Sequence, residues 1–240
     1  MKLAILSDIH SAADHYEAGL AAARAEGFDR LIILGDLFTY GPEPARVMDL
    51  TLDAIDRDGA VLIAGNHDQM YLELAAGHSD YAPRLQEWIR ESVEWTVTKL
   101  DSAPSLHDLP WQEEWSADGV LIAHANPFGF GDWTYLTDDD RFERACVTLS
   151  ERGFGFGLFG HTHRFRVYEA SDGTRAATVG SIGQPRTRGS PTSEWALLTI
   201  GDTVELDRRV IDLGWGKLQA DIRASSLSPA TQQRLCEYFH

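Results

Sequence analysis

The sequence predicts an α/β protein, and three observations carry the prediction. Short, uninterrupted apolar runs recur along the chain and suit strands that are buried on both faces. Helical patterns separate the first three runs, with a unit length of about 30 residues that fits a βαβ crossover. Strand-like segments separated by Asp-Gly or Gly-Asp turns follow in the later part. The early strands are therefore expected to be mostly parallel and the late hairpins antiparallel.

Five short apolar runs predict the buried strands. They lie at residues 3–6, 31–34, 61–64, 120–123 and 158–159, each bounded by Gly, Asp, Asn or His. Helical spacing predicts helices over residues 13–26, 43–57 and 83–99, the last opening with Pro83. Gly27 is a natural residue to end the first helix, because glycine readily adopts the left-handed conformation there. The first third of the chain is therefore predicted to be β-α-β-α-β.

Four further segments predict the antiparallel hairpins, and two predict closing helices. The strand-like segments are residues 166–170, 175–180, 195–200 and 203–211. The helices are expected at residues 213–225 and 229–239, with Ser228 as N-cap and Pro229 at the first helical position. Residues 125–140 form the longest expected loop, and long loops in compact domains are often functional.

Length and composition indicate a soluble globular protein with one domain over residues 1–240. The chain is 43% hydrophobic and 24% charged, which is ordinary for this class. Its 37 Asp and Glu outnumber its 21 Lys and Arg, so the net charge is −16. This balance makes nucleic acid and anionic membranes unfavourable partners, because both attract clustered basic side chains.

The cysteines and the apolar runs bear on the cellular compartment. Cys146 and Cys236 are too few for a disulfide framework, so we expect buried or idle thiols in a reducing compartment. No run approaches 18 apolar residues, and the N-terminal apolar stretch is too short for a signal peptide. We therefore expect a cytoplasmic protein without a spanning helix.

Polar side chains with metal-binding atoms follow each of the five apolar runs. The blocks are Asp8-Ile9-His10, Gly35-Asp36, Gly65-Asn66-His67-Asp68, His124 and Gly160-His161-Thr162-His163. In open α/β sheets, ligands bind at the carboxyl ends of the strands, so these groups are expected to converge. Each block alone is a weak signal, but together they predict a metal site. The other histidines, His15, His78, His107 and His240, are expected to be ordinary surface residues.

The five blocks, in this order, resemble the signature of the calcineurin-like metallophosphoesterases. Residues 35–42 (Gly-Asp-Leu-Phe-Thr-Tyr-Gly-Pro) and 179–186 (Val-Gly-Ser-Ile-Gly-Gln-Pro-Arg) are similar to segments of the family's small bacterial and archaeal phosphodiesterase branch. The resemblance extends from Lys2 to about Phe239. It implies a four-layer fold in which two mixed β-sheets pack as a sandwich between flanking helices.

The resemblance also implies two divalent transition-metal ions. One site would take Asp8, His10, Asp36 and His163, and the other Asp36, Asn66, His124 and His161. Asp36 would bridge the two ions. Carboxylates with imidazoles suit manganese, our first expectation, or iron, zinc, nickel or cobalt. Such a pair clamps the attacking and leaving oxygens of a phosphoryl transfer and generates hydroxide near neutral pH.

Three more residues are candidates for catalysis. His67 matches the family's histidine that is not a ligand, and its implied role is to donate to the leaving oxygen or to stabilise a phosphate oxygen. Asp68 either orients His67 or caps the following helix, and capping is the simpler interpretation. Arg186 either forks onto a phosphate or is a solvated loop arginine.

Aromatic residues near these blocks leave alternatives open. Tyr40 either lines the pocket or shapes a turn. Trp133 and Tyr135, in the loop after His124, either stack on a nucleobase or pack internally, and packing is favoured. Thr39 and Tyr40 occupy the positions at which the protein Ser/Thr phosphatases of this family have Asp and Arg. A dedicated phosphoprotein phosphatase is therefore disfavoured.

The predicted function is metal-dependent hydrolysis of a small or nucleotide phosphodiester by a metal-bound hydroxide. A phosphomonoesterase or a dinucleoside polyphosphate hydrolase is an alternative within the same enzyme class. A non-catalytic scaffold of the same fold is the alternative from another class, although the seven ligand positions and His67 are all filled. A nuclease is disfavoured by the acidic balance, and the oligomeric state is not predicted.

Overall fold

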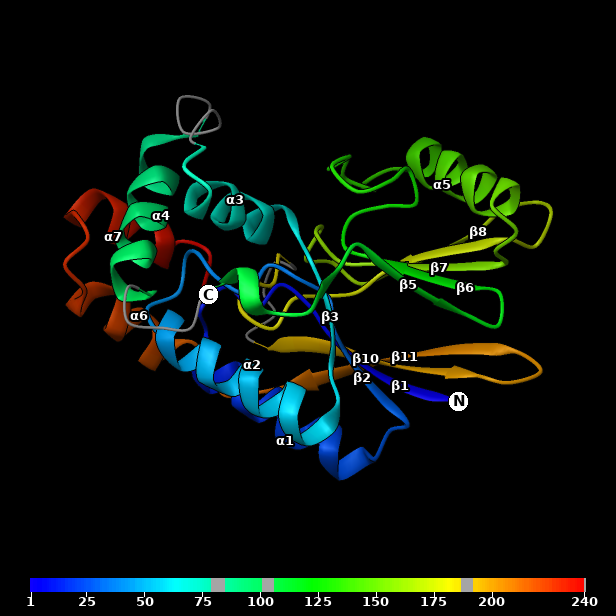
Figure 1. Cartoon of the computed structure of the whole chain (residues 1–240), viewed down its shortest axis with the longest axis horizontal. Coiled ribbons are helices and arrows are strands. Elements are labelled where there is room, and N and C mark those ends of the chain that lie inside the picture. Colours follow the sequence, from blue (N-terminus) through cyan, green and yellow to red (C-terminus); the bar gives the residue numbers. More distant parts are fainter. Residues whose placement is uncertain (79–84, 101–105, 187–191, 240) are drawn as a thin grey trace.

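Two mixed β-sheets pack face to face between layers of helices (Figure 1). The computed structural model describes every residue except 79–84, 101–105, 187–191 and 240. The sequence of layers is helices, first sheet, second sheet and helix, with further helices at one end of the sandwich. The predicted fold class is confirmed.

The first sheet combines four parallel strands with one antiparallel hairpin. In sheet order its strands are β11 (Val204–Ile211), β10 (Ser193–Ile200), β1 (Lys2–Leu6), β2 (Arg30–Ile33), β3 (Val61–Ile63) and β4 (Trp111–Gln112). Strands β1 to β4 run parallel, whereas β10 is antiparallel to both β1 and β11. The parallel early strands and the late hairpin agree with the prediction.

The second sheet has a parallel centre and antiparallel edges. Its order is β5 (Glu114–Ala117), β6 (Val120–Ala123), β7 (Phe156–Phe159), β9 (Arg175–Thr178) and β8 (Arg166–Glu169). Strands β6, β7 and β9 are parallel, while β5 and β8 pair antiparallel with their neighbours. Strands β4 and β5 were not predicted, because neither contains an apolar run.

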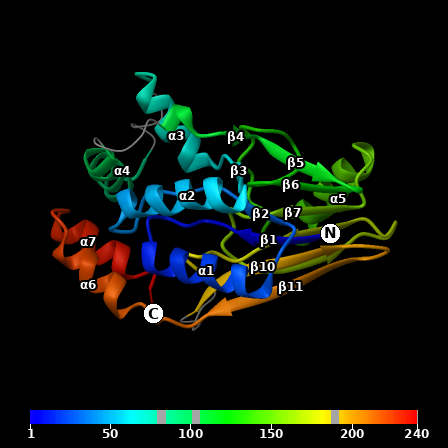
Figure 2. The same cartoon turned by 60° about the horizontal axis from the view of Figure 1, so that its bottom comes forward.

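Helices cover the outer faces of both sheets and the carboxyl ends of the strands (Figures 1 and 2). Helices α1 (Ala13–Glu26) and α2 (Pro44–Asp58) pack on the first sheet, and α5 (Asp139–Glu151) packs on the second. The other elements are α3 (Asn66–Ala75), α4 (Glu87–Leu100), the 3₁₀ turn η2 (Leu106–Asp108), α6 (Gly216–Ala224) and α7 (Pro229–Cys236). Helices α4, α6 and α7 pack together at one end of the molecule.

The predicted helices agree with the described ones to within a few residues. Helix 13–26 is confirmed, and Gly27 follows it with a φ of 71°. The Ser228 hydroxyl accepts the backbone N–H of Thr231 at 3.3 Å, which confirms the predicted N-cap. Pro83, the predicted start of helix 83–99, lies outside the described residues, whereas Glu87–Leu100 is helical. Helices α3 and α5 were missed, although α5 buries Phe142, Ala145, Cys146 and Leu149 at helical spacing.

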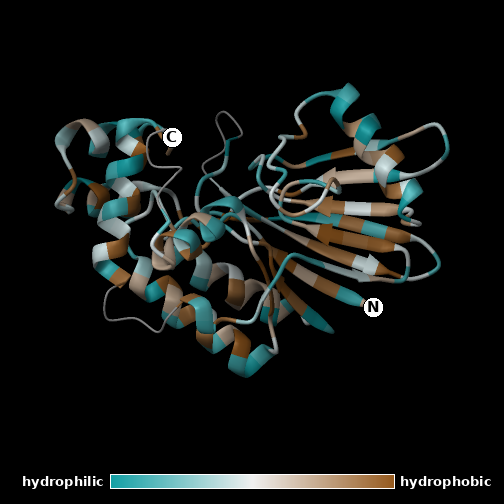
Figure 3. Ribbon diagram, turned by 45° about the horizontal axis from the view of Figure 1, so that its top comes forward, coloured by the Kyte–Doolittle hydropathy of each residue, from teal (hydrophilic) through white to brown (hydrophobic). Residues whose placement is uncertain are grey.

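Apolar side chains fill the space between the two sheets. Leu3 and Ile5 of the first sheet meet Ile122 and Leu158 of the second, and all four are fully buried. Figure 3 shows the same strands as hydrophobic along much of their length. Both cysteines are free and buried, as predicted. None of the helices among the described residues is long and apolar enough to cross a membrane.

Replacing Leu158 by Ala should lower the free energy of unfolding by about 2–5 kcal/mol, because the packed sheets cannot close the cavity completely. Urea unfolding followed by tryptophan fluorescence measures this change. Val210→Ala is the control, since Val210 is 55% exposed and should change stability by less than about 0.5 kcal/mol. Equal effects of the two substitutions would contradict the described inter-sheet core.

Candidate metal centre

The predicted metal-binding blocks lie at the carboxyl ends of strands from both sheets. Asp8 and His10 follow β1, Asp36 follows β2, and Asn66 begins α3 directly after β3. His124 follows β6, and His161 and His163 follow β7. All of these except the half-buried Asn66 are buried. The face-to-face packing of the sheets therefore brings five distant segments into one polar site.

A first group joins Asp8, His10, Asp36 and His163. One ligand atom from each lies within 4.8 Å of the others. His163 Nε2 is 3.1 Å from Asp8 Oδ1 and 3.2 Å from His10 Nε2. His10 Nε2 is 3.8 Å from Asp36 Oδ2. These four residues are the set that the resemblance implies for one ion.

A second group joins Asp36, His124 and His161. His124 Nε2 lies 3.5 Å from Asp36 Oδ2, so the Asp36 carboxylate belongs to both groups. Asn66, the fourth ligand implied for this site, presents a buried amide oxygen without a hydrogen-bond partner among the described residues. The geometry thus matches two adjacent sites that share Asp36.

Each histidine of the two groups is held by a backbone carbonyl through one ring nitrogen. The pairs are His10 Nδ1 with Phe38 O (3.0 Å), His124 Nδ1 with Leu34 O (2.7 Å), His163 Nδ1 with Gln184 O (2.6 Å) and His161 Nε2 with Trp133 O (3.1 Å). Because a carbonyl can only accept, these nitrogens donate, and the other nitrogen of each neutral ring carries a lone pair. Carbonyl bonds of this kind fix the tautomer of metal-binding histidines.

The free lone pairs fit a bound cation. With both Nδ1 atoms donating, Nε2 of His10 and Nε2 of His163 face each other at 3.2 Å without a proton between neutral rings. Asp8 Oδ1 and His124 Nε2 are buried and have no hydrogen-bond partner among the described residues. Acceptors this close repel each other unless positive charge lies between them. The donor set of nitrogen and carboxylate oxygen suits a divalent transition metal.

The electrostatics of the buried carboxylates lead to the same conclusion. Burial opposes ionisation of Asp8 and Asp36, yet the surrounding histidines outweigh it and hold both pKa values below the ordinary range. Burial likewise lowers the pKa of His124, but the Asp36 carboxylate outweighs burial and raises that pKa to about 10. Positive charge beside these buried carboxylates therefore favours their ionised forms, and a bound metal ion would supply it.

The backbone after these strands is held in an unfavourable conformation. Among the described residues, nine that are not glycine have positive φ, and eight of them lie in or beside the site with φ between 48° and 75°. The eight are Asp8, His10, Ser11, Asp36, Thr39, Tyr40, His161 and His163. Side chains other than glycine rarely adopt this region, and such strain concentrates at functional sites. The strained turns aim the side chains of successive strand ends at a common centre.

Asp68 ties two of these segments together. Its carboxylate accepts the backbone N–H of Asp36 (2.6 Å), Leu37 (3.0 Å) and Gly65 (2.9 Å). A Cβ on Gly65 would come within 2.3 Å of Asp36 Oδ1, so only glycine permits this approach. Asp68 therefore caps the start of α3, and its carboxylate bonds to backbone rather than to the His67 ring.

His67 is oriented instead by residues that follow β2. Thr39 Oγ1 lies 2.9 Å from His67 Nδ1, and Tyr40 Oη lies 3.3 Å from His67 Nε2. The His67 ring also meets the edge of the His10 ring, with centroids 5.2 Å apart. His67 thus sits beside the first group. No role was predicted for the hydroxyl of Thr39.

Arg186 lies at the rim of the site and is half-buried. Its guanidinium donates to Gln184 Oε1 at 3.3 Å and lies 6.0 Å from the centre of the Tyr135 ring. Burial, and after it the positive charge of Arg186, lowers the pKa of His163. The guanidinium is therefore electrostatically close to His163 of the first group.

The aromatic loop after β6 covers the second group. Tyr135 stacks on the His161 ring at a centroid distance of 4.0 Å and remains 41% exposed. Trp133 meets the His124 ring edge-on at 5.9 Å, and its indole donates to Gln69. Trp133 therefore packs, as favoured, whereas Tyr135 both packs and presents surface beside the site.

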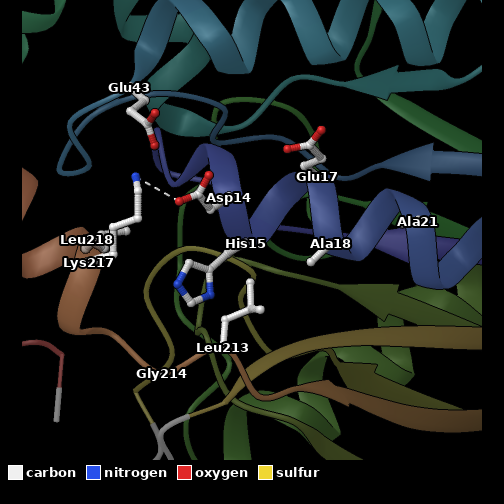
Figure 4. A pocket seen from close by; sticks show the side chains of 10 residues that line it. All are labelled: Asp14, His15, Glu17, Ala18, Ala21, Glu43, Leu213, Gly214, Lys217 and Leu218. Atoms are coloured by element: carbon white, nitrogen blue, oxygen red, sulfur yellow. Dashed lines mark ion pairs between the residues drawn. The ribbon is translucent and has the colours of Figure 1, made fainter.

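His15 was predicted to be a surface residue, and this is wrong. It is 3% exposed, stacks on Trp215 at 4.0 Å and shares a hydrogen bond with Ser193 Oγ. It borders a cavity of about 400 Å³ between α1 and the segment before α6 (Figure 4). None of the predicted site residues lines this cavity, and its Asp14 is paired with Lys217 at 2.9 Å. His78 and His107 are exposed, as predicted, and His240 lies outside the described residues.

Comparison with known proteins agrees with this geometry. The model of the calcineurin-like phosphoesterase superfamily domain matches residues 1–203. An uncharacterized protein of Methanocaldococcus jannaschii is 30% identical over an alignment of 196 residues, and the match covers 77% of this chain and 77% of that one.

Solved structures show the same fold. A hypothetical protein of Pyrococcus horikoshii has a TM-score of 0.81 at 19% identity, with 98% of this chain and 97% of that one covered. A metallophosphoesterase of Sphaerobacter thermophilus has a TM-score of 0.73 at 22% identity, with 98% of both chains covered.

The chain therefore belongs to the calcineurin-like phosphoesterase superfamily. As a member, it is a metal-dependent hydrolase of phosphoric esters.

Metal content should depend on Asp36 more than on any other ligand, because its carboxylate belongs to both groups. At a manganese concentration that fills both sites of the wild type, Asp36→Asn should lose both ions and His124→Ala only one. Mass spectrometry of the dialysed proteins counts the bound metal. Asp207→Asn, on the exposed face of β11, is the control and should retain both ions. Full metal content in Asp36→Asn would contradict the shared ligand.

Proposed function

We propose that this protein is a dinuclear metallophosphoesterase that hydrolyses a small or nucleotide phosphodiester. One observation carries the proposal: two groups of ligand atoms share the Asp36 carboxylate, and His67 lies beside them without being part of either group. The proposed ligands are Asp8, His10, Asp36, Asn66, His124, His161 and His163. Manganese is the proposed metal, with iron, zinc, nickel or cobalt as alternatives.

Two such ions would bind the attacking water and the leaving oxygen of the ester, and would lower the pKa of that water. The protein's own residues provide the rest of the chemistry. Asn66 is a neutral ligand and so limits the negative charge that would repel a phosphate. His67 is placed to donate to a phosphate or leaving oxygen, and Arg186 to bind a non-bridging oxygen.

The charge distribution supports a small substrate. The chain carries a net charge of −16, so an extended polyanion would be repelled over most of the surface. Two metal ions and Arg186 would make the immediate site positive, which admits a single phosphoester group. The exposed face of Tyr135, which covers His161, offers a stacking surface for a nucleobase or an aryl group.

Two alternative functions remain, and they differ in the substrate or in the residues that they require. A phosphomonoesterase or a dinucleoside polyphosphate hydrolase would use the same ligands with a different substrate. A scaffold without activity would not need His67, and the filled ligand set with His67 in place argues for catalysis. We also propose a cytoplasmic location, because two cysteines without a disulfide framework suit a reducing compartment.

The purified protein should hydrolyse bis-p-nitrophenyl phosphate when manganese is added, and chelation by EDTA should stop the reaction. Asp36→Asn and His124→Ala should each reduce kcat at least about a hundredfold without unfolding the protein, because each removes a proposed ligand. Release of p-nitrophenolate at 405 nm, with circular dichroism to verify folding, measures both effects.

Asp207→Asn is the matched control for Asp36→Asn and should retain wild-type activity. No turnover with manganese, nickel, cobalt or iron by well-folded wild-type protein would reject the phosphodiesterase proposal. Turnover of p-nitrophenyl phosphate with none of the diester would favour the phosphomonoesterase alternative.

A further inference from the structure

Two buried hydroxyl groups form a hydrogen-bonded chain that ends at Nδ1 of the His67 ring. Thr39 Oγ1 lies 2.9 Å from His67 Nδ1 and also 2.9 Å from Tyr71 Oη. Thr39 is fully buried, and Tyr71 is 2% exposed. The opposite ring nitrogen, Nε2, faces Tyr40 Oη at 3.3 Å, and the Tyr40 ring packs on the His10 ring with centroids 4.7 Å apart. Nδ1 of His67 therefore faces the buried hydroxyls, and Nε2 faces the Tyr40 hydroxyl beside the candidate metal centre.

The two hydroxyl groups can fix the tautomer of His67. A threonine hydroxyl carries one proton and can accept two hydrogen bonds. If Tyr71 donates to Thr39, the Thr39 proton is directed to His67 Nδ1, which then accepts. The neutral ring consequently carries its own proton on Nε2, where it faces the site. The reverse order would leave Nε2 without a proton in the neutral ring.

The local fold holds this chain of hydroxyls in place. Thr39 has a φ of 75°, which is unfavourable for a β-branched residue and persists only where the surroundings impose it. His67 and Tyr71 lie four residues apart on α3 and therefore project from the same face of the helix. The Tyr71 ring is fixed in turn by edge-on contact with Phe38 at 5.8 Å.

We propose that Thr39, supported by Tyr71, is a positioning residue that keeps the proton of neutral His67 on Nε2, facing the leaving oxygen of the phosphoester. The hydrogen bond from Nε2 stabilises the negative charge that develops on that oxygen as its bond to phosphorus breaks. This inference rests on the proposed phosphodiesterase function and assigns His67 the leaving oxygen rather than a non-bridging oxygen.

The consequence is a dependence on the leaving group. An oxygen that leaves as p-nitrophenolate carries a delocalised charge and needs little stabilisation, whereas phenolate needs more. Loss of the Thr39 hydroxyl should therefore slow hydrolysis of diphenyl phosphate more than that of bis-p-nitrophenyl phosphate. General loss of structure would slow both substrates alike.

The test compares Thr39→Val, Thr39→Ser and Tyr71→Phe in the manganese-loaded protein. Thr39→Val keeps the shape without the hydroxyl and should lower kcat for diphenyl phosphate about tenfold or more beyond its effect on bis-p-nitrophenyl phosphate, with little change in KM. Thr39→Ser restores the hydroxyl and should recover most of the difference. Tyr71→Phe should give a smaller change in the same direction.

The chain offers a matched control in a second buried threonine–tyrosine pair. Thr51 Oγ1 lies 3.4 Å from Tyr16 Oη between α1 and α2, and none of its hydrogen-bond partners within the described part of the chain is a histidine. Thr51→Val removes an equivalent buried hydroxyl and should change the rates on both substrates equally. Thermal unfolding of each variant shows whether it is folded.

A spectroscopic readout is independent of turnover. In the zinc-loaded protein labelled with ¹⁵N-histidine, the His67 signals are assigned by their disappearance in His67→Gln. They should show a protonated Nε2 and an accepting Nδ1, and Thr39→Val, but not Thr51→Val, should shift the Nδ1 signal.

The outcomes separate the inference from the function on which it rests. Wild-type protein inactive on both diesters rejects the proposed function and the inference with it. Active wild type with equal losses on both substrates in Thr39→Val, or with a protonated Nδ1, rejects the inference alone.

Discussion

The site depends on a carboxylate that we do not propose as a ligand. Asp68 binds three backbone N–H groups, from the segment after β2 and from the start of α3, and so joins the ends of two neighbouring strands. Burial and the neighbouring Asp36 charge raise the pKa of Asp68 to about 7, whereas these hydrogen bonds favour its ionised form. They hold Asp36 in its left-handed conformation and bring Gly65 against its side chain. The Asp36 carboxylate, which belongs to both groups, is thereby held in position.

Hydrogen bonds to the backbone also fix the histidine rings of the site. Each of the four histidines in the two groups donates one ring proton to a backbone carbonyl of a strand end or an adjoining loop. The remaining ring lone pairs converge with the carboxylates of Asp8 and Asp36 in a buried region. These groups accept hydrogen bonds, and few donors lie among them. Such an arrangement is costly by itself and becomes favourable with divalent cations. These backbone hydrogen bonds therefore arrange the histidine lone pairs so that bound cations would stabilise the site.

The sequence predicted which residues converge at the candidate site, because most of them lie directly after a strand. Asp8, Asp36, His124 and the His161–His163 pair each follow a recognisable apolar run. The sequence did not predict which residues of distant segments contact each other. Thr39 and Tyr71 meet because α3 lies against the segment after β2, and His15 is buried where it stacks on Trp215. Helix α3 was missed because its first residue is itself one of the metal-binding blocks.

The sequence by itself determined the α/β class, the early alternation of strands and helices with late antiparallel strands, and the residue types of the candidate metal centre. These follow from periodicity, turn residues and ligand chemistry, all of which act over short stretches of chain. The tertiary structure decided which atoms face each other: the two groups sharing Asp36, the capping role of Asp68 and the hydroxyls behind His67. These relations depend on the docking of two sheets and on strained backbone turns, whose energy is balanced by contacts between distant segments.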